Sequence, residues 1–178
     1  MPTFDQTNSE CVVYVYREGL ASAVGHDVAI EATSFEIEVD EDSRVVEARF
    51  EADALKVRHA MEDGEPNPGA LSDGDKKKIE KNMRRKVLET KRHPVISFRS
   101  TAVDDDGSTV RIEGVLDLHG VERDVAFDAR RGDDYIRARV RLHQPDFDIE
   151  PYRAFLGALR VKAEVDVEVR LPAATLVE

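Results

Sequence analysis

Apolar and polar residues alternate one by one along much of this chain. The clearest run covers residues 161–171, where valines, an alanine and a leucine occupy the odd positions and charged residues the even ones. Side chains of a strand point alternately to its two faces, so this run predicts a strand with one buried and one solvated face. Rougher alternation predicts two more strands, over residues 46–52 and 136–142.

Five further segments have the composition and flanking turn residues of strands. They cover residues 11–17, 26–39, 95–103, 109–118 and 123–131. Within 26–39 the apolar set changes phase near Thr33 and Ser34, which indicates a β-bulge that bends a long strand. Most connections are short, and His119-Gly120 has the length and residue types of a two-residue hairpin turn. We therefore expect eight antiparallel strands that curl into a barrel.

One segment interrupts the hairpins. Residues 56–93 form a long insertion, in which the glycines and prolines of residues 64–69 are typical of a loop, and a helix is then expected from about 75 to about 92. Ser72 or Asp73 can cap this helix, and its narrow apolar stripe suits a helix lying against the mouth or wall of a barrel. We interpret residues 1–10 as an N-terminal tail and residues 1–178 as a single domain.

Composition narrows the function classes. The 178 residues carry a formal net charge of −11, which repels phosphate backbones, and we expect no nucleic-acid partner. The single cysteine, Cys11, lies among valines and is expected to be buried. With no signal-like N-terminus and no long apolar run, the chain as given is expected to be cytoplasmic.

The signatures of common chemistries are missing from the sequence. No nucleophile elbow, phosphate-binding loop or dinucleotide fingerprint occurs, and we assign no catalytic residue. The five histidines have no zinc-ligand spacing, so a metal site would have to be assembled by the fold, and we expect none. His119 is interpreted as a turn residue.

Several ordered motifs together resemble the YceI-like family. They are Gly25-His26-Asp27, the strand His93 to Ser100, the hairpin Gly114 to Val121, and Asp146 to Ile149. Members of this family form lipocalin-like barrels and bind polyisoprenoids or other long apolar molecules. The resemblance implies an eight-stranded lipocalin-like barrel that carries or stores an apolar amphiphile such as a polyisoprenoid, a quinone or a fatty-acid-like lipid. It implies no catalysis and no further cofactor.

The alternation also predicts which side chains face the interior. The expected lining is Val28, Ile30, Ile37, Phe50, Phe98, Ile112, Leu116, Phe127, Ile136, Val140, Val161 and Val165. His26, Arg58 and His59 are expected at a polar rim. Three alternatives stay open, namely a core filled by its own side chains, an enzyme that uses His26 on a bound lipid, and a partner-binding barrel that forms a homodimer.

The expected helix is strongly basic within an acidic chain. Lys76, Lys77, Lys81, Arg84 and Arg85 are candidates for transient contact with an anionic membrane surface. The alternative is that these residues are simply solvated or pair with carboxylates of the barrel.

Overall fold

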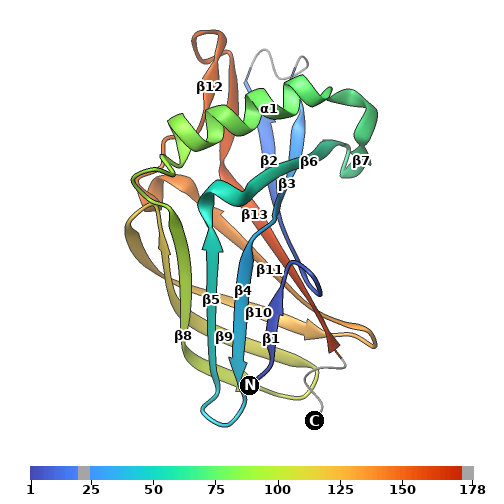
Figure 1. Ribbon diagram of the computed structural model, residues 1–178, viewed down its shortest axis with the longest axis vertical. Coiled ribbons are helices and arrows are strands. Elements are labelled where there is room, and N and C mark those ends of the chain that lie inside the picture. Colours follow the sequence, from blue (N-terminus) through green and yellow to red (C-terminus); the bar gives the residue numbers. More distant parts are fainter. Residues whose placement is uncertain (20–24, 174–178) are drawn as a thin grey trace.

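The computed structural model describes residues 1–19 and 25–173, which form a curled antiparallel sheet with one helix lying across its end (Figure 1). The strands found among these residues are β1 (Thr3–Asp5), β2 (Glu10–Glu18), β3 (Asp27–Ala32), β4 (Phe35–Asp40), β5 (Val45–Glu51), β6 (Leu55–Glu62), β7 (Glu65–Asn67), β8 (Val95–Asp105), β9 (Thr109–Leu118), β10 (Val121–Arg131), β11 (Tyr135–His143), β12 (Arg153–Ala154) and β13 (Leu159–Pro172). The helical segments are η2 (Ala52–Ala54), η3 (Pro68–Ala70), α1 (Asp73–Asn82), η4 (Met83–Val87), η5 (Gln144–Phe147) and η6 (Phe155–Gly157).

The larger strand number arises mainly from breaks in long strands. β3 pairs with β2 and β6, whereas β4, its continuation past the bend, pairs with β1 and β5. From β5 the ladder continues through β8, β9, β10, β11 and β13, and β13 then pairs with β2. When β1–β2, β3–β4 and β5–β6 are each counted as one bent strand, they make eight strands together with β8, β9, β10, β11 and β13, as expected from the sequence. β7 and β12 are short additional strands.

The expected bend at Thr33 and Ser34 is present as a break between β3 and β4. The amide and the hydroxyl of Thr33 both donate hydrogen bonds to the carbonyl oxygen of Ala54, at 2.9 and 2.7 Å. Ala54 belongs to η2, so the two neighbouring strands break at the same level. Because both strands break here, the apolar side chains can change from one alternation phase to the other, while β3 still pairs with β6 and β4 with β5.

Two expectations about the chain outside the barrel were wrong. Residues 1–10 are not a tail, because β1 pairs with β4 and Phe4 is fully buried in the core. The insertion expected over 56–93 begins later, because residues 56–62 belong to β6, which pairs with β3. Both segments were misassigned because short strands with mixed composition give little alternation.

The helix also differs from the expected span of 75–92. Ser72 caps α1 in a capping box with Asp75, with hydrogen bonds of 3.0 and 3.1 Å, so the helix starts at Asp73. It ends in the π-helical turn η4, and Glu89 then adopts a left-handed conformation with φ of 47°. Over residues 1–19 and 25–173 we find no helix long and apolar enough to cross a bilayer.

Candidate ligand cavity

The curled sheet encloses an internal cavity of about 1050 Å³. Its wall is built from the apolar phase of the strands all around the sheet, and α1 with η4 covers one end. Residues of the β4–β5 hairpin line the opposite end, so the cavity extends along the long axis of the molecule in Figure 1. A core filled by its own side chains would leave no space of this size.

The structure brings together all of the apolar residues expected to face inward. The cavity is lined by Val28, Ile30, Ile37, Phe50, Phe98, Ile112, Leu116, Phe127, Ile136, Val140, Val161 and Val165, among others. They come from strands that are far apart in the sequence but share the inner face of one sheet. Period-two alternation predicts which side chains face inward, because successive residues of a strand point to opposite faces. A register slip of one residue would turn the whole apolar set outward.

The position of Phe98 depends on a glycine in the neighbouring strand. β8 pairs with β9, and a Cβ atom on Gly114 would lie 2.5 Å from the Phe98 ring and 2.5 Å from the carbonyl oxygen of Arg99. The Phe98 ring therefore packs over Gly114, and its centroid lies 5.7 Å from that of Phe127. This arrangement gives a physical role to the glycine that opens the hairpin motif.

The lid, by which we mean α1, η4 and Leu88 (residues 73–88), contributes four apolar side chains to the cavity. Ile79, Met83 and Val87 form the stripe expected from the sequence, and Leu88 joins them. An α-helical continuation would place Leu88 on another face. In the structure the Leu88 amide donates to the carbonyl oxygen of Met83, and this wider turn brings Val87 and Leu88 to the same cavity.

Polar side chains line the two ends of the cavity. At the lid end, His26 is mostly exposed at the mouth and lies near Asp75 and Lys78 of α1. Asn82 donates to the hydroxyl of Tyr152 at 3.3 Å at the same end. At the opposite end the Arg131 guanidinium is 2.7 Å from the Asp105 carboxylate.

His26 is the residue that the enzyme alternative requires, so its polar neighbours bear on that expectation. Among the described residues, no hydrogen bond joins a His26 ring nitrogen to an acid. The nearby Asp75 carboxylate accepts a hydrogen bond from the Ser72 amide at 3.0 Å, and hydrogen bonding with Ser72 lowers its pKa.

Two of the three residues expected at the polar rim lie elsewhere. Arg58 does not line the cavity; its guanidinium is 3.0 Å from Glu10 and 3.5 Å from Glu31. The register of β3 and β6 shifts at this point, pairing Ile30 with Val57 and Ala29 with His59, so Arg58 is the extra residue of a bulge. His59 is also absent from the lining, and its Nδ1 contacts the carbonyl oxygen of Ala60.

Cys11 is buried and lines the cavity, which agrees with its interpretation as a small apolar residue. Burial away from water raises the pKa of its thiol to about 12. The thiolate is the reactive form of cysteine, so this side chain contributes packing rather than nucleophilic chemistry.

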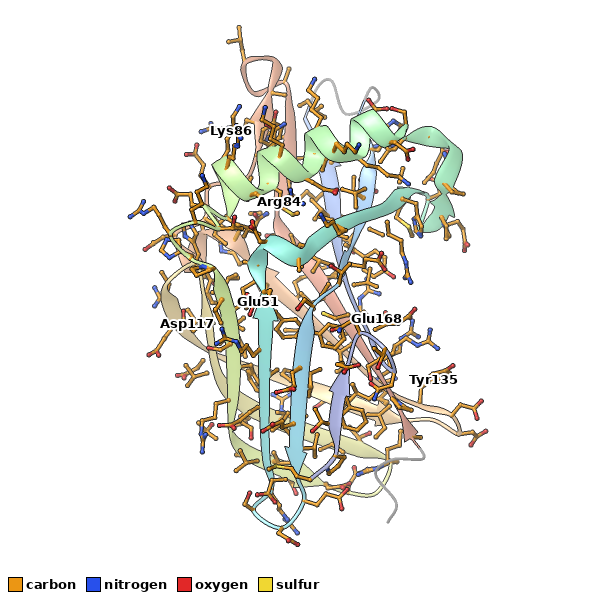
Figure 2. The ribbon with its side chains drawn as sticks, in the orientation of Figure 1. Glu51, Arg84, Lys86, Asp117, Tyr135 and Glu168 are labelled. Atoms are coloured by element: carbon orange, nitrogen blue, oxygen red, sulfur yellow. The ribbon has the colours of Figure 1, made fainter. Side chains whose placement is uncertain are left out.

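The basic residues of the helix do not share one face. Lys77, Lys81 and Arg85 are exposed, as is Lys86, whereas Arg84 is turned toward the sheet, 4.0 Å from Asp53 (Figure 2). Lys76 is half-buried. Arg84 therefore does not belong to the outward basic surface expected from the sequence, because it lies one turn after Glu80 and directly after Met83, which are both buried.

Outside the cavity, the fold assembles a cluster that sequence spacing did not reveal. His119 adopts the expected turn conformation with φ of 57°, and Gly120 follows with φ of 71°. In addition, its Nε2 lies 3.1 Å from Glu89, and its ring is 4.4 Å from that of His93. Hydrogen bonds from Arg92 and His119 lower the pKa of Glu89. The expectation of no metal site rested on spacing alone, and these residues are brought together by tertiary structure.

The sequence model of the YceI-like domain matches residues 3–173, nearly the whole described barrel. The chain belongs to the YceI-like family. No curated protein shows significant sequence similarity to it. The family assignment agrees with the ordered motifs in the sequence, all of which fall within the matched residues.

Solved structures share the fold of this YceI-like chain at low sequence identity. BcnA from Burkholderia cenocepacia is 12% identical, with a TM-score of 0.64 over 95% of this chain and 98% of BcnA. A polyisoprenoid binding domain from Saccharophagus degradans, implicated in plant cell wall breakdown, is 15% identical, with a TM-score of 0.58 over 92% and 91%. The Campylobacter jejuni YceI protein is 12% identical, with a TM-score of 0.52 over 77% of each chain. At these identities the likeness concerns the fold.

Proposed function

We propose that this YceI-like chain binds, carries or stores an apolar amphiphile inside its barrel, without transforming it. The observation that carries the proposal is the cavity of about 1050 Å³, which is at the upper end of the usual range of about 300–1000 Å³ for ligand pockets. Its wall is aliphatic and aromatic through the middle, and its polar side chains lie at the ends. That distribution suits a long apolar chain with a small polar head.

The proposed ligand class is an isoprenoid-like lipid, a quinone or a fatty-acid-like lipid. A polyisoprenoid binding domain is among the proteins that share the fold, which supports an isoprenoid within this class. We place the polar head at the lid end, where His26, Lys78 and Asn82 offer hydrogen-bond donors beside the cavity.

A matched pair of substitutions tests whether the ligand occupies the cavity. Ala138 in β11 lines the cavity, whereas Ala126 in β10 is exposed on the outer face. Ala138→Phe adds a ring to the interior, and Ala126→Phe adds the same ring outside. Native mass spectrometry after incubation with farnesol, ubiquinone or palmitate, each separately, measures binding to the parent and to both variants.

We expect the parent and Ala126→Phe to bind at least one of these probes at one molecule per chain. Ala138→Phe should bind it at least about tenfold more weakly, because the new ring takes space that the ligand needs. Equal binding by both variants would place the ligand outside the cavity, and binding of no probe by the parent would count against the proposal.

We also propose that the exposed basic side of the lid contacts anionic membrane transiently during ligand exchange. Lys77, Lys81 and Arg85 supply this surface, with Lys86 beside them. Lipid-like ligands reside in membranes, and the lid covers the cavity end, so contact at this surface would bring that end to the ligand.

A further inference from the structure

Glu89, His93 and His119 converge outside the cavity, where the lid meets the β9–β10 hairpin. One ligand atom from each side chain lies within 4.8 Å of the other two. The closest pair is Nε2 of His119 and Oε2 of Glu89 at 3.1 Å, and the two imidazole rings have centroids 4.4 Å apart. The three residues come from two separate parts of the chain and none of them lines the cavity.

The hydrogen bonds of His119 leave its neutral imidazole with no hydrogen to donate to Glu89. Nδ1 lies 3.1 Å from the carbonyl oxygen of Phe147, which only accepts, so Nδ1 carries the hydrogen. In the neutral ring, Nε2 then presents a lone pair to the carboxylate of Glu89, which also only accepts. Two lone pairs at this distance require a cation between them, either a proton on Nε2 or a metal ion.

We propose that Glu89, His93 and His119 form a binding site for a divalent transition-metal ion, best matched by Zn²⁺. Two imidazoles and one carboxylate are the donor set of many three-ligand zinc sites, in which water takes the fourth position. Zinc–ligand distances of about 2.0–2.1 Å in a tetrahedron put neighbouring donor atoms about 3.3 Å apart. The 3.1 Å separation of Nε2 and Oε2 is close to that value.

The surroundings of the three side chains also fit a metal site. Metal-binding histidines commonly donate their other ring hydrogen to a carbonyl, as His119 does to Phe147. Arg92 contacts Oε1 of Glu89 at 3.2 Å and leaves Oε2 for the ion. The Arg92 side chain is 72% exposed, so it can move away from a bound cation.

The backbone is shaped to bring the donors together. Glu89 and His119 both have positive φ, of 47° and 57°, a conformation that is unfavourable for residues other than glycine. The amide of His93 donates to the carbonyl oxygen of Glu89 at 3.0 Å, which closes a turn with both side chains near each other. A Cβ atom on Gly120 would lie 3.0 Å from the His93 ring, so the absence of a side chain at Gly120 leaves space for this ring. Strain of this kind is often found at functional sites.

The location suggests what the metal would do. Leu88 and Leu118 line the cavity, and each immediately precedes a ligand of the cluster, Glu89 or His119. An ion bound here would fasten the C-terminal end of the lid to the wall of the barrel. Metal binding would therefore stabilise the closed lid, whatever the cavity holds.

Isothermal titration calorimetry, in which ZnCl₂ is added to the metal-free protein, tests the site. The variants are His119→Asn, His93→Asn and Glu89→Gln; asparagine tolerates the left-handed conformation at 119. The matched control is His143→Asn, because Nδ1 of His143 also lies 3.0 Å from a carboxylate, that of Asp146, but no third ligand joins them among residues 1–19 and 25–173. Circular dichroism establishes that each variant is folded.

We expect one Zn²⁺ per parent chain, unchanged affinity in His143→Asn, and affinity lowered at least about 100-fold in each folded cluster variant, since even indirect partners of a ligand contribute about 10–100-fold. Zn²⁺ should also raise the Tm of the parent but not of His119→Asn. Failure of the parent to bind Zn²⁺, or parent-like affinity in His93→Asn and His119→Asn, would overturn the proposal. The cluster would then be an imidazolium–carboxylate pair.

Discussion

Asp166 shows how a polar residue on the outer face can be structural. It lies in the polar phase of β13, yet only 5% of its side chain is exposed. Arg141 from β11 holds both carboxylate oxygens, at 2.9 and 3.0 Å, and Tyr16 from β2 donates its hydroxyl. These contacts, led by Arg141, hold the pKa of Asp166 well below its usual range. The carboxylate therefore connects three adjacent strands where the sheet returns to β2.

We predict a pH-dependent contribution of Asp166 to stability. A lowered folded pKa means that the charge stabilises the fold above the unfolded pKa of about 3.9, and that this stabilisation is lost as the pH falls through the folded value. Asp166→Asn should therefore reduce the free energy of unfolding at pH 7 by about 1–3 kcal/mol, the range for hydrogen bonds to charged groups. Urea unfolding at pH 7, 5 and 3 should show the deficit shrinking below about pH 4.

Asp128→Asn is the matched control for Asp166→Asn. Asp128 in β10 also pairs with an arginine of the neighbouring strand, Arg111, at 3.1 Å, but both side chains are 49% exposed. Exposed pairs contribute little, so this variant should stay close to the parent at every pH. Equal destabilisation by the two variants, or a deficit of Asp166→Asn that is as large at pH 3 as at pH 7, would contradict the assigned role.

Alternation alone could not reveal this role. It correctly put Asp166 and Glu168 on the outer face and their valine neighbours on the inner face. Their burial depends on side chains from other strands, including Arg137, which donates a hydrogen bond to Glu168. A single sequence shows which face a residue occupies, whereas its coverage depends on which strands become neighbours.

At the scale of elements, the lid illustrates what local signals predict. Capping chemistry indicated its start within two residues, and four-residue spacing identified its apolar stripe. The π-helical turn η4 and the left-handed Glu89 that end it had no sequence signal that we could recognise. Arg84 was placed outside with the other basic residues because of its charge, although it packs toward Asp53.

We predict that the exposed basic side of the lid controls binding to anionic vesicles. Lys77, Lys81 and Arg85 project into solvent, and each contributes about 1 kcal/mol near an anionic surface. The triple variant Lys77→Glu, Lys81→Glu and Arg85→Glu should lose co-sedimentation with phosphatidylserine-containing vesicles at low salt. Raising the salt should release the parent as well, because ions screen this attraction.

A triple variant with the same change in net charge serves as the control. Arg111, Arg123 and Arg130 are exposed residues of β9 and β10, whereas α1 packs on β6. Their replacement by glutamate should leave most of the vesicle binding in place. Equal loss in both variants would indicate a response to net charge, and no binding by the parent would leave the lid as a cover only.

At the scale of the whole molecule, the inner face was predictable and the enclosed volume was not. The twelve residues expected inside all line the cavity because strand alternation fixes the direction of each side chain. Whether eight strands enclose a ligand space or a solid core depends on strand tilt, on the paired breaks near Thr33 and Ala54, and on the lid. The Glu89, His93 and His119 cluster was missed for a similar reason, since only the fold brings the hairpin to the lid.

The central claim is that the cavity holds an apolar amphiphile in the cell. The most direct test is organic extraction of the purified protein, followed by mass spectrometry of the extract and comparison with Ala138→Phe and Ala126→Phe purified in the same way. We predict a lipid of isoprenoid, quinone or fatty-acid type at close to one per chain in the parent and in Ala126→Phe, and much less in Ala138→Phe. Consistent absence of lipid from the parent, also after the cells are fed with these lipids, would contradict the account.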